Sequence, residues 1–366
     1  MNPSRPAQDL PAKEFQSRVR RLLACQRHQR LDAVLIVTDI NRYYFTGLQA
    51  SNGVLLTEPA AEPAFYTDFR YLTMARRLAP WLPCHTLWRH SEEPLVLAGM
   101  SHAGWSRIGY EGNIDAARFL RLKAALPHVE WVDISETIAG LRSVKSRAEQ
   151  QALRAALAAN DQLFAALVRQ TAPGMSEWDI CGIVRREADR LGQGEAFSTI
   201  ACVGRNGAEC HHSPDGTLLK QGQPLLVDLG LKLDHYCADM TRCVFFGTPS
   251  PLYRELFGIV LAANLKAVRA IRPGVPCCEI DAVARRHIET AGYGRFFGHG
   301  LGHGLGLEVH ESPSFSPSCK TVLKPGMVIT VEPGIYLPGK LGIRIEDVVL
   351  VTRGGCEVLT RTPHAF

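Results

Sequence analysis

Hydrophobic positions in the first part of the chain show both the 3.6-residue period of helices and the short apolar runs typical of buried strands. An amphipathic helix is predicted over 15–29. The other elements predicted before residue 135 are strands at 32–37, 53–56, 64–66 and 106–110 and helices near 71–78 and at 115–125. Helices that alternate with strands favour a layered α/β domain, and we expect the segment 135–146 to link it to a second domain.

The remainder of the chain shows a different order of elements. Long helices are predicted over 149–170 and 250–271, and each is followed by a second helix. One of these begins near Ser176, which stands at capping-box spacing from Asp179, and the other covers 278–291. Strands follow each helix pair, at 197–203, 224–231 and 236–246 and again at 327–331 and 343–351. Helix, helix and sheet thus occur twice, which predicts an internal duplication, although no residue-by-residue repeat proves it.

Composition and charge narrow the class of protein. The 366 residues are 46% hydrophobic and 21% charged, which is globular composition for two or three domains. The net charge of +5 is too diffuse for a dedicated nucleic-acid binder. No apolar run is long enough for a membrane helix, and residues 1–24 lack the apolar segment of a secretory signal. We expect the arginine-rich stretch 18–30 to be a helix with a solvated basic face, with a transit peptide or membrane-surface helix as the alternative.

Eleven cysteines are scattered without any C-x-x-C pair, so neither a zinc ribbon nor a thioredoxin-type site is predicted. An odd number of cysteines in a chain of this length indicates reduced thiols and a cytoplasmic protein. Cysteine therefore indicates the compartment and not the chemistry.

Four carboxylates stand within or beside apolar strands, where a lone acid is costly unless it is paired or bound to a metal. Asp228 lies in the run LLVDLG and Asp239 in ADMTR. The turn at 232–235 lets these two strands pair antiparallel and brings both acids to one face. Glu332 directly follows another predicted strand, and Glu346 lies in GIRIEDV.

A glycine-rich run at 298–310 contributes His299, His303 and His310. So many glycines indicate a close approach of the backbone to another group, or positive φ. A phosphate-binding loop is the rival interpretation, but neither the P-loop spacing nor G-x-G-x-x-G is present. With the four acids, one imidazole completes an oxygen-rich ligand set that suits two divalent ions, with Mn²⁺ preferred and Zn²⁺, Co²⁺ or Fe²⁺ as alternatives.

These stretches occur in the order of a known family. VDLG, ADMTR, HGLGHGLGLEVHE, VEPGIY and GIRIEDVVLV resemble the pita-bread metallopeptidases of family M24, in particular the branch of Xaa-Pro aminopeptidase (aminopeptidase P) and prolidase. In the first third, NRYYFTG and YTDFRY resemble the creatinase/prolidase N-terminal domain. The resemblance implies an α+β protein in which a smaller α/β creatinase-type domain, residues 1–140, precedes a catalytic domain, residues 141–366. This second domain would have the pita-bread (creatinase/aminopeptidase) fold with a duplicated helix-helix-sheet unit.

By position, the resemblance also implies the site residues. The five metal ligands would be Asp228, Asp239, His303, Glu332 and Glu346. The histidines that act on the substrate would be His211 and His310, although His212 leaves the first of them ambiguous by one residue. The pocket would be lined by His299, Tyr336 and Arg344. Arg344 would either hold a carboxylate of the substrate or orient a metal-bound acid.

The implied activity is hydrolysis of the Xaa-Pro bond at the N-terminus of peptides, by a hydroxide held between two divalent ions with Glu332 as general base. Xaa-Pro dipeptidase (prolidase) is the alternative, and a metal-free creatinase-like or non-catalytic binding protein of the same fold is the alternative from another class. A Ser or Cys nucleophile is disfavoured because no G-x-S-x-G elbow is present.

The implied partners are a peptide with proline in second position and a second subunit in a homodimer. Glu209 and Cys210 depart from the family pattern, as do the extra glycines Gly304 and Gly306. The family pattern therefore does not fix the composition of the specificity pocket.

Overall fold

The computed structural model describes residues 10–87 and 104–364. The described residues form two compact units that divide between Leu141 and Arg142, inside helix α6 (Ser135–Ser143). Residues 1–9, part of the segment expected to lack a secretory signal, lie outside the described residues. Within the described ranges, every helix is too short or too polar to cross a membrane.

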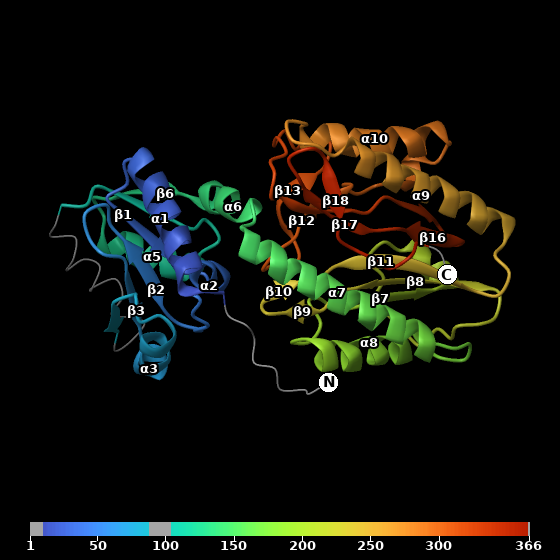
Figure 1. Ribbon diagram of the computed structural model, residues 1–366, viewed down its shortest axis with the longest axis horizontal. Coiled ribbons are helices and arrows are strands. Elements are labelled where there is room, and N and C mark those ends of the chain that lie inside the picture. The colour runs from blue at the N-terminus through green and yellow to red at the C-terminus, as the bar shows by residue number, and fades with distance from the viewer. Residues whose placement is uncertain (1–9, 88–103, 365–366) are drawn as a thin grey trace. The chain divides into compact units, whose positions relative to one another are not determined.

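The N-terminal unit is built on a six-stranded mixed sheet with the strand order β4-β3-β2-β1-β5-β6 (Figure 1). Strand β1 (Ala33–Ile36) is central because all four of its side chains are apolar and buried. It pairs parallel with β5 (Arg107–Tyr110) and antiparallel with β2 (Val54–Thr57). The other elements are β3 (Ala64–Thr67), β4 (Cys84–Thr86), β6 (Glu130–Asp133), α1 (Ala12–His28), α2 (Asp39–Thr46), α3 (Phe69–Leu78) and α5 (Ala116–Ala125). The predicted layered α/β domain is confirmed.

Helix α1 differs in one respect from the helix with a solvated basic face that was expected over 18–30. Its basic face is only partly solvated, because Arg18 is fully buried while Arg20 and Arg27 are exposed. The Arg18 guanidinium carbon lies 4.2 Å from the centre of the Tyr44 ring, and its Nη1 donates to the Tyr44 carbonyl at 2.8 Å. A guanidinium that stacks on an aromatic ring and donates to a carbonyl tolerates burial, which a count of charges along the helix cannot reveal.

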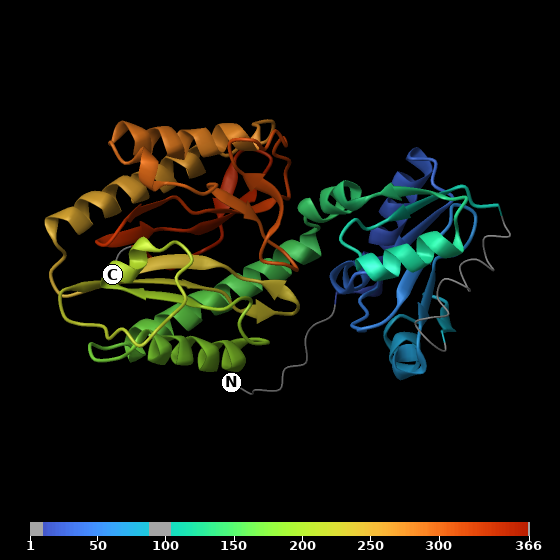
Figure 2. The ribbon, with the colours of Figure 1, turned by 180° about the vertical axis from the view of Figure 1, so that it is seen from behind.

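Two helix pairs lie on opposite sides of the strands in the C-terminal unit (Figures 1 and 2). The first pair, α7 (Arg147–Gln170) and α8 (Glu177–Leu191), packs on the sheet formed by β7 (Ile200–Val203), β8 (Gln223–Leu229) and β11 (Met240–Phe246). The second pair, α9 (Pro251–Ala270) and α10 (Cys277–Thr290), packs on the sheet formed by β12 (Gly302–Gly304), β13 (Glu311–Phe315), β14 (Val328–Val331), β17 (Asp347–Val351) and β18 (Cys356–Val358). Two small hairpins join β9 (Lys232–Leu233) to β10 (Tyr236–Cys237) and β15 (Gly334–Leu337) to β16 (Leu341–Arg344).

The two helix pairs are related by a repeat that the hydrophobic pattern alone does not reveal. Identical residues recur at a spacing of 100 positions in Val168-Arg169 and Val268-Arg269, in Pro173-Gly174 and Pro273-Gly274, and in Arg185-Arg186 and Arg285-Arg286. Gly174 and Gly274 both have positive φ, +99° and +88°, in the turn between the helices, which favours glycine at each. These few matches agree with the duplication expected from the order of elements.

Candidate metal centre

The five side chains predicted as ligands come from five separate segments of the C-terminal unit. Each stands within a strand or directly beside one, where the extended backbone fixes the direction of its side chain. The strands concerned are β8 for Asp228, β11 for Asp239, β12 for His303, β14 for Glu332 and β17 for Glu346. Distant parts of the sequence therefore supply one site.

The distances between these groups are short. Asp239, His303 and Glu346 offer ligand atoms that all lie within 4.8 Å of one another. His303 Nε2 lies 3.3 Å from Glu332 Oε1 and 3.6 Å from Asp239 Oδ2. Asp228 lies opposite Thr241 in the antiparallel pairing of β8 with β11, and Asp239 is two residues before Thr241, so both acids are on one face. The predicted pairing of these two strands is confirmed.

Negative charge is crowded at this centre. Burial, with the carboxylates of Glu346 and Asp228, raises the pKa of Asp239 well above its usual range. Burial, with Glu332 and Asp228, raises the pKa of Glu346 in the same way. Asp228 Oδ1 and Glu346 Oε1 are buried without a hydrogen-bond partner. Such oxygens are costly unless a cation compensates them, so these residues fit divalent metal ions.

The side chain of Arg344 orients the acids, directly for Asp228 and through Thr241 for Glu346. It is 2% exposed, its Nη2 donates to Asp228 Oδ2 at 2.6 Å, and its Nε donates to Thr241 Oγ1 at 3.0 Å. Thr241 in turn donates to Glu346 Oε2 at 2.8 Å. Contacts of this kind fix the direction of metal ligands. Of the two roles expected for Arg344, the orientation of Asp228 is the one with a direct contact.

Two of the orienting residues were missed by sequence reasoning. Thr241 could have been found, because the strand period of two places it on the same face as Asp239. Asn264, on α9, is fully buried, and its Nδ2 donates to the carbonyls of Val331 at 2.9 Å and Ile345 at 3.4 Å. These two residues directly precede Glu332 and Glu346. The only signal for Asn264 is an amide within an apolar helix, and its partners lie too far along the chain to be predicted.

The predicted substrate-side residues surround the acids. His299 Nε2 lies 3.0 Å from the Tyr336 hydroxyl, which also accepts a hydrogen bond from Arg344 Nη1 at 2.9 Å. The His310 ring packs edge-on against His303, with 4.3 Å between ring centres, and the side chain is exposed. Partial burial of the ring and the neighbouring His303 lower the pKa of His310. His310 is therefore an exposed imidazole beside the proposed ligands.

The adjacent histidines His211 and His212 have different surroundings. His212 is buried and lies 2.8 Å from a Glu177 carboxylate oxygen. His211 is exposed, and its charge contributes to lowering the pKa of both His299 and His310. His212 is thus bound to Glu177, whereas His211 is exposed.

The glycines of the histidine loop allow close backbone packing. A side chain at Gly302 would meet the Thr330 carbonyl, and one at Gly304 would lie 2.5 Å from the Ser312 carbonyl oxygen. A side chain at Gly306 would lie 2.6 Å from the Glu311 carboxylate. The close approach predicted from the glycine content is confirmed at these positions.

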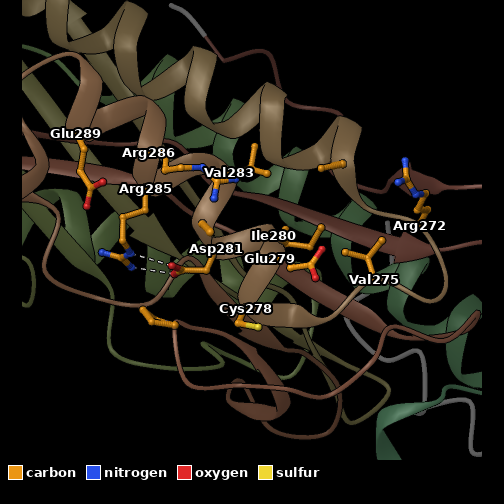
Figure 3. Close-up of a pocket in the computed structure, with 13 residues that line it drawn as sticks. Arg272, Val275, Cys278, Glu279, Ile280, Asp281, Val283, Arg285, Arg286 and Glu289 are labelled. Atoms are coloured by element: carbon orange, nitrogen blue, oxygen red, sulfur yellow. Dashed lines mark hydrogen bonds and ion pairs between the residues drawn. The ribbon is translucent and has the colours of Figure 1, made fainter.

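A cavity of about 630 Å³ lies beside α10, and none of the predicted site residues lines it. Figure 3 shows the residues that line this cavity. Its ion pair between Asp281 and Arg285 nevertheless supports the centre. Arg285 donates to the Phe297 and His299 carbonyls at 3.0 and 2.9 Å, and Asp281 Oδ1 accepts from the Leu301 amide at 3.1 Å. The pair therefore holds the backbone on both sides of His299.

The fold and the acidic centre define a two-domain metallohydrolase. The family model "Metallopeptidase family M24" matches residues 151–353, and "Creatinase/Prolidase N-terminal domain" matches residues 18–144. The chain belongs to metallopeptidase family M24, which confirms the resemblance, the pita-bread fold and the enzyme class expected from the sequence.

Relatives support the same assignment. The Xaa-Pro dipeptidase of Pyrococcus furiosus is 33% identical over 349 residues, which cover 95% of this chain and 99% of the relative. The crystal structure of the prolidase from Pyrococcus horikoshii is 32% identical with a TM-score of 0.90, over 95% of this chain and 99% of that one. The X-Pro aminopeptidase of Thermotoga maritima is 33% identical with a TM-score of 0.85, over 93% and 99% of the two chains.

Proposed function

We propose that this protein is a dinuclear-metal peptidase that hydrolyses the Xaa-Pro bond at the N-terminus of peptides, as an Xaa-Pro aminopeptidase. The observation that carries the proposal is the convergence of Asp228, Asp239, His303, Glu332 and Glu346, with two buried carboxylate oxygens left without partners. The peptidase relatives named above act on Xaa-Pro substrates by their names, and this supports the choice of substrate.

The proposed cofactors are two divalent ions, with Mn²⁺ first because four of the five ligands are hard oxygen donors. Asp239 and Glu346 would be shared between the ions, Asp228 would complete one, and His303 with Glu332 would complete the other. Bound ions of this kind activate water and polarise the scissile carbonyl.

The proposed domains are an N-terminal domain of residues 1–140 and a catalytic domain of residues 141–366.

Glu332 is the proposed general base. Burial by itself raises the pKa of this carboxyl, but the hydrogen bond and charge of His303 outweigh burial and lower it. As a carboxylate, Glu332 can take a proton and return it to the leaving nitrogen. His211 and His310 would donate to the oxygen that becomes negative in the transition state, and such a donor is worth about 10²–10³ in rate.

Metal content and activity together test the proposal. Asp239→Asn and Glu332→Gln should each lower the release of the N-terminal residue from Gly-Pro-Ala by at least about 100-fold, and Asp239→Asn should also lower bound metal. Glu279→Gln, at an exposed acid of α10, is the matched control and should behave as the parent. If both acid variants cut as fast as the parent, the chain is a metal-free or non-catalytic member of the fold.

Xaa-Pro dipeptidase is the second candidate, because the Pyrococcus relatives are named as a dipeptidase and a prolidase. A dipeptidase must bind the free carboxylate next to proline, whereas an aminopeptidase must leave room for a longer chain. The kcat/KM for Gly-Pro should therefore be compared with that for Gly-Pro-Ala. A preference for the tripeptide supports the aminopeptidase, and cleavage of Gly-Pro alone identifies a dipeptidase.

Two further properties complete the proposal. A cytoplasmic location is supported by eleven cysteines that are all free, since an oxidising compartment would favour pairing. A homodimer is proposed from the family resemblance, and light scattering of the purified protein measures it.

A further inference from the structure

The loop between β7 and β8 carries His211, and one buried side chain binds it at several points. Glu177, the first residue of α8, is 0% exposed. Its Oε1 accepts from the Val203 amide at 2.7 Å and from Asn206 Nδ2 at 2.9 Å. Its Oε2 lies 2.8 Å from His212 Nε2 and accepts from the Asp215 amide at 2.9 Å. Glu177 therefore binds the loop before and after His211.

His212 completes this arrangement with its second ring nitrogen. His212 Nδ1 lies 3.0 Å from Glu209 Oε2, while Nε2 contacts Glu177. A neutral imidazole has only one N–H, so two carboxylate partners require the imidazolium, in which both nitrogens donate. The charged groups that face His212 are Glu177 from α8 and Glu209 and Asp215 from its own loop; the charge of His212 contributes to lowering the pKa of Asp215. The uncharged amide of Asn206 also lies beside the ring, with its Nδ2 3.2 Å from His212 Nε2.

The same loop contacts the metal centre directly. The Cys210 carbonyl, next to His211, accepts from Arg344 Nη1 at 3.2 Å. Gly207 lies so close to Gly342 in β16 that no side chain fits between them. Any change in the path of this loop therefore moves His211 relative to Arg344 and the acids that Arg344 orients.

We propose that His212, bound between Glu177 and Glu209, is a positioning residue that holds the loop 204–217 so that His211 faces the metal centre. The expected effect on catalysis rests on the proposed function, whereas the expected effect on the loop does not. His212 itself touches neither the metal ligands nor the substrate pocket; it acts through its neighbour. The proposal assigns the substrate-side role to His211, because His212 holds the loop.

The arrangement depends on pH in a defined direction. Burial lowers the pKa of His212, but Glu209 and Glu177 outweigh burial and raise it above its ordinary value of 6.5. A raised pKa means that the stabilisation is fully present below the ordinary value and is lost as the pH rises through the raised one. The loop should therefore loosen on the alkaline side of neutrality.

The first test is hydrogen exchange of the loop, which needs no bound metal and no substrate. In His212→Gln, the amides of Val203 and Asp215 should exchange at least about tenfold faster than in the parent at pH 7, with exchange within α8 unchanged. In the parent, the exchange rate of these amides, corrected for its intrinsic pH dependence, should rise between pH 7 and pH 9. In His212→Gln, the corrected rate should already be high at pH 7. His128→Gln, at an exposed histidine, is the matched control.

The second test is kinetic. His212→Gln should lower kcat for Gly-Pro-Ala about 10–100-fold with bound metal unchanged, because a misplacement of about 1 Å costs this much. Glu209→Gln, at a side chain that is 72% exposed, should lower kcat less than His212→Gln. The proposal is overturned if the loop of His212→Gln exchanges at the same rate as in the parent. It is also overturned if the loop of His212→Gln exchanges faster while kcat is unchanged. If the parent cuts no Xaa-Pro peptide, the proposed function fails, and the exchange experiment still decides the structural role of His212. If His212→Gln does not fold, the pH dependence of exchange in the parent decides it.

Discussion

Glu311 allows a direct test of how the histidine loop is held. Its Oε1 accepts from Arg142 Nη2 at 2.5 Å, and its Oε2 accepts from Lys145 Nζ at 3.0 Å. All three side chains are buried. The same carboxylate accepts from the Glu308 amide at 3.2 Å and lies against Gly306, so it supports the loop that bears the histidines. Glu311→Gln keeps the shape of the side chain and leaves two buried cations without this partner.

The pKa of Glu311 sets the size of the effect. Burial raises the pKa of this carboxyl, but Lys145 and Arg142 outweigh burial and lower it from 4.5 to about 2. A shift of this size corresponds to about 3 kcal/mol of unfolding free energy at pH 7. Because the folded pKa is lowered, this stabilisation is present above the ordinary value and is lost as the pH falls through it toward the folded value. By pH 3, roughly 2 kcal/mol should be lost.

Urea unfolding followed by circular dichroism measures the effect. At pH 7, Glu311→Gln should lower the unfolding free energy by about 3 kcal/mol, and the difference from the parent should shrink to about 1 kcal/mol at pH 3. Glu308→Gln is the control, because Glu308 also binds Arg142, at 2.7 Å, but is half-exposed and should cost less than about 1 kcal/mol. A difference that is the same at pH 3 and pH 7 would refute the reasoning.

Two other predictions concern groups that orient the acids. Arg344→Lys keeps the charge but loses the planar fork that donates to Asp228 and its neighbours, so metal affinity and kcat should each fall about 10–100-fold; an unchanged metal titration would contradict this role. Asn264→Leu leaves two backbone carbonyls, of Val331 and Ile345, without their donor just before Glu332 and Glu346, so the unfolding free energy should fall by about 1–3 kcal/mol in urea. Unfolding equal to that of the parent would show that these hydrogen bonds do not stabilise the strands.

The order of the motifs was enough to predict the family, the catalytic fold and the duplicated helix-helix-sheet unit. The reason is that strand-borne acids, histidines and turn glycines are local features, with a residue type and spacing that can be read along the chain. The pairing of the strands that carry Asp228 and Asp239 was predicted from the turn between them, whereas the convergence of His303 and Glu346 with Asp239 was implied by the family resemblance. For this part of the protein, sequence and structure lead to the same centre.

Only the tertiary structure decided which groups surround that centre. The burial of His212 depends on Glu177, which lies 35 residues away along the chain. The burial of Arg18 depends in the same way on a ring 26 residues away. Burial and hydrogen bonding between distant segments set the orientation and charge of a side chain, and no spacing along the chain encodes them. The sequence thus determined which residues are available for chemistry, and the folded chain determined how they are held.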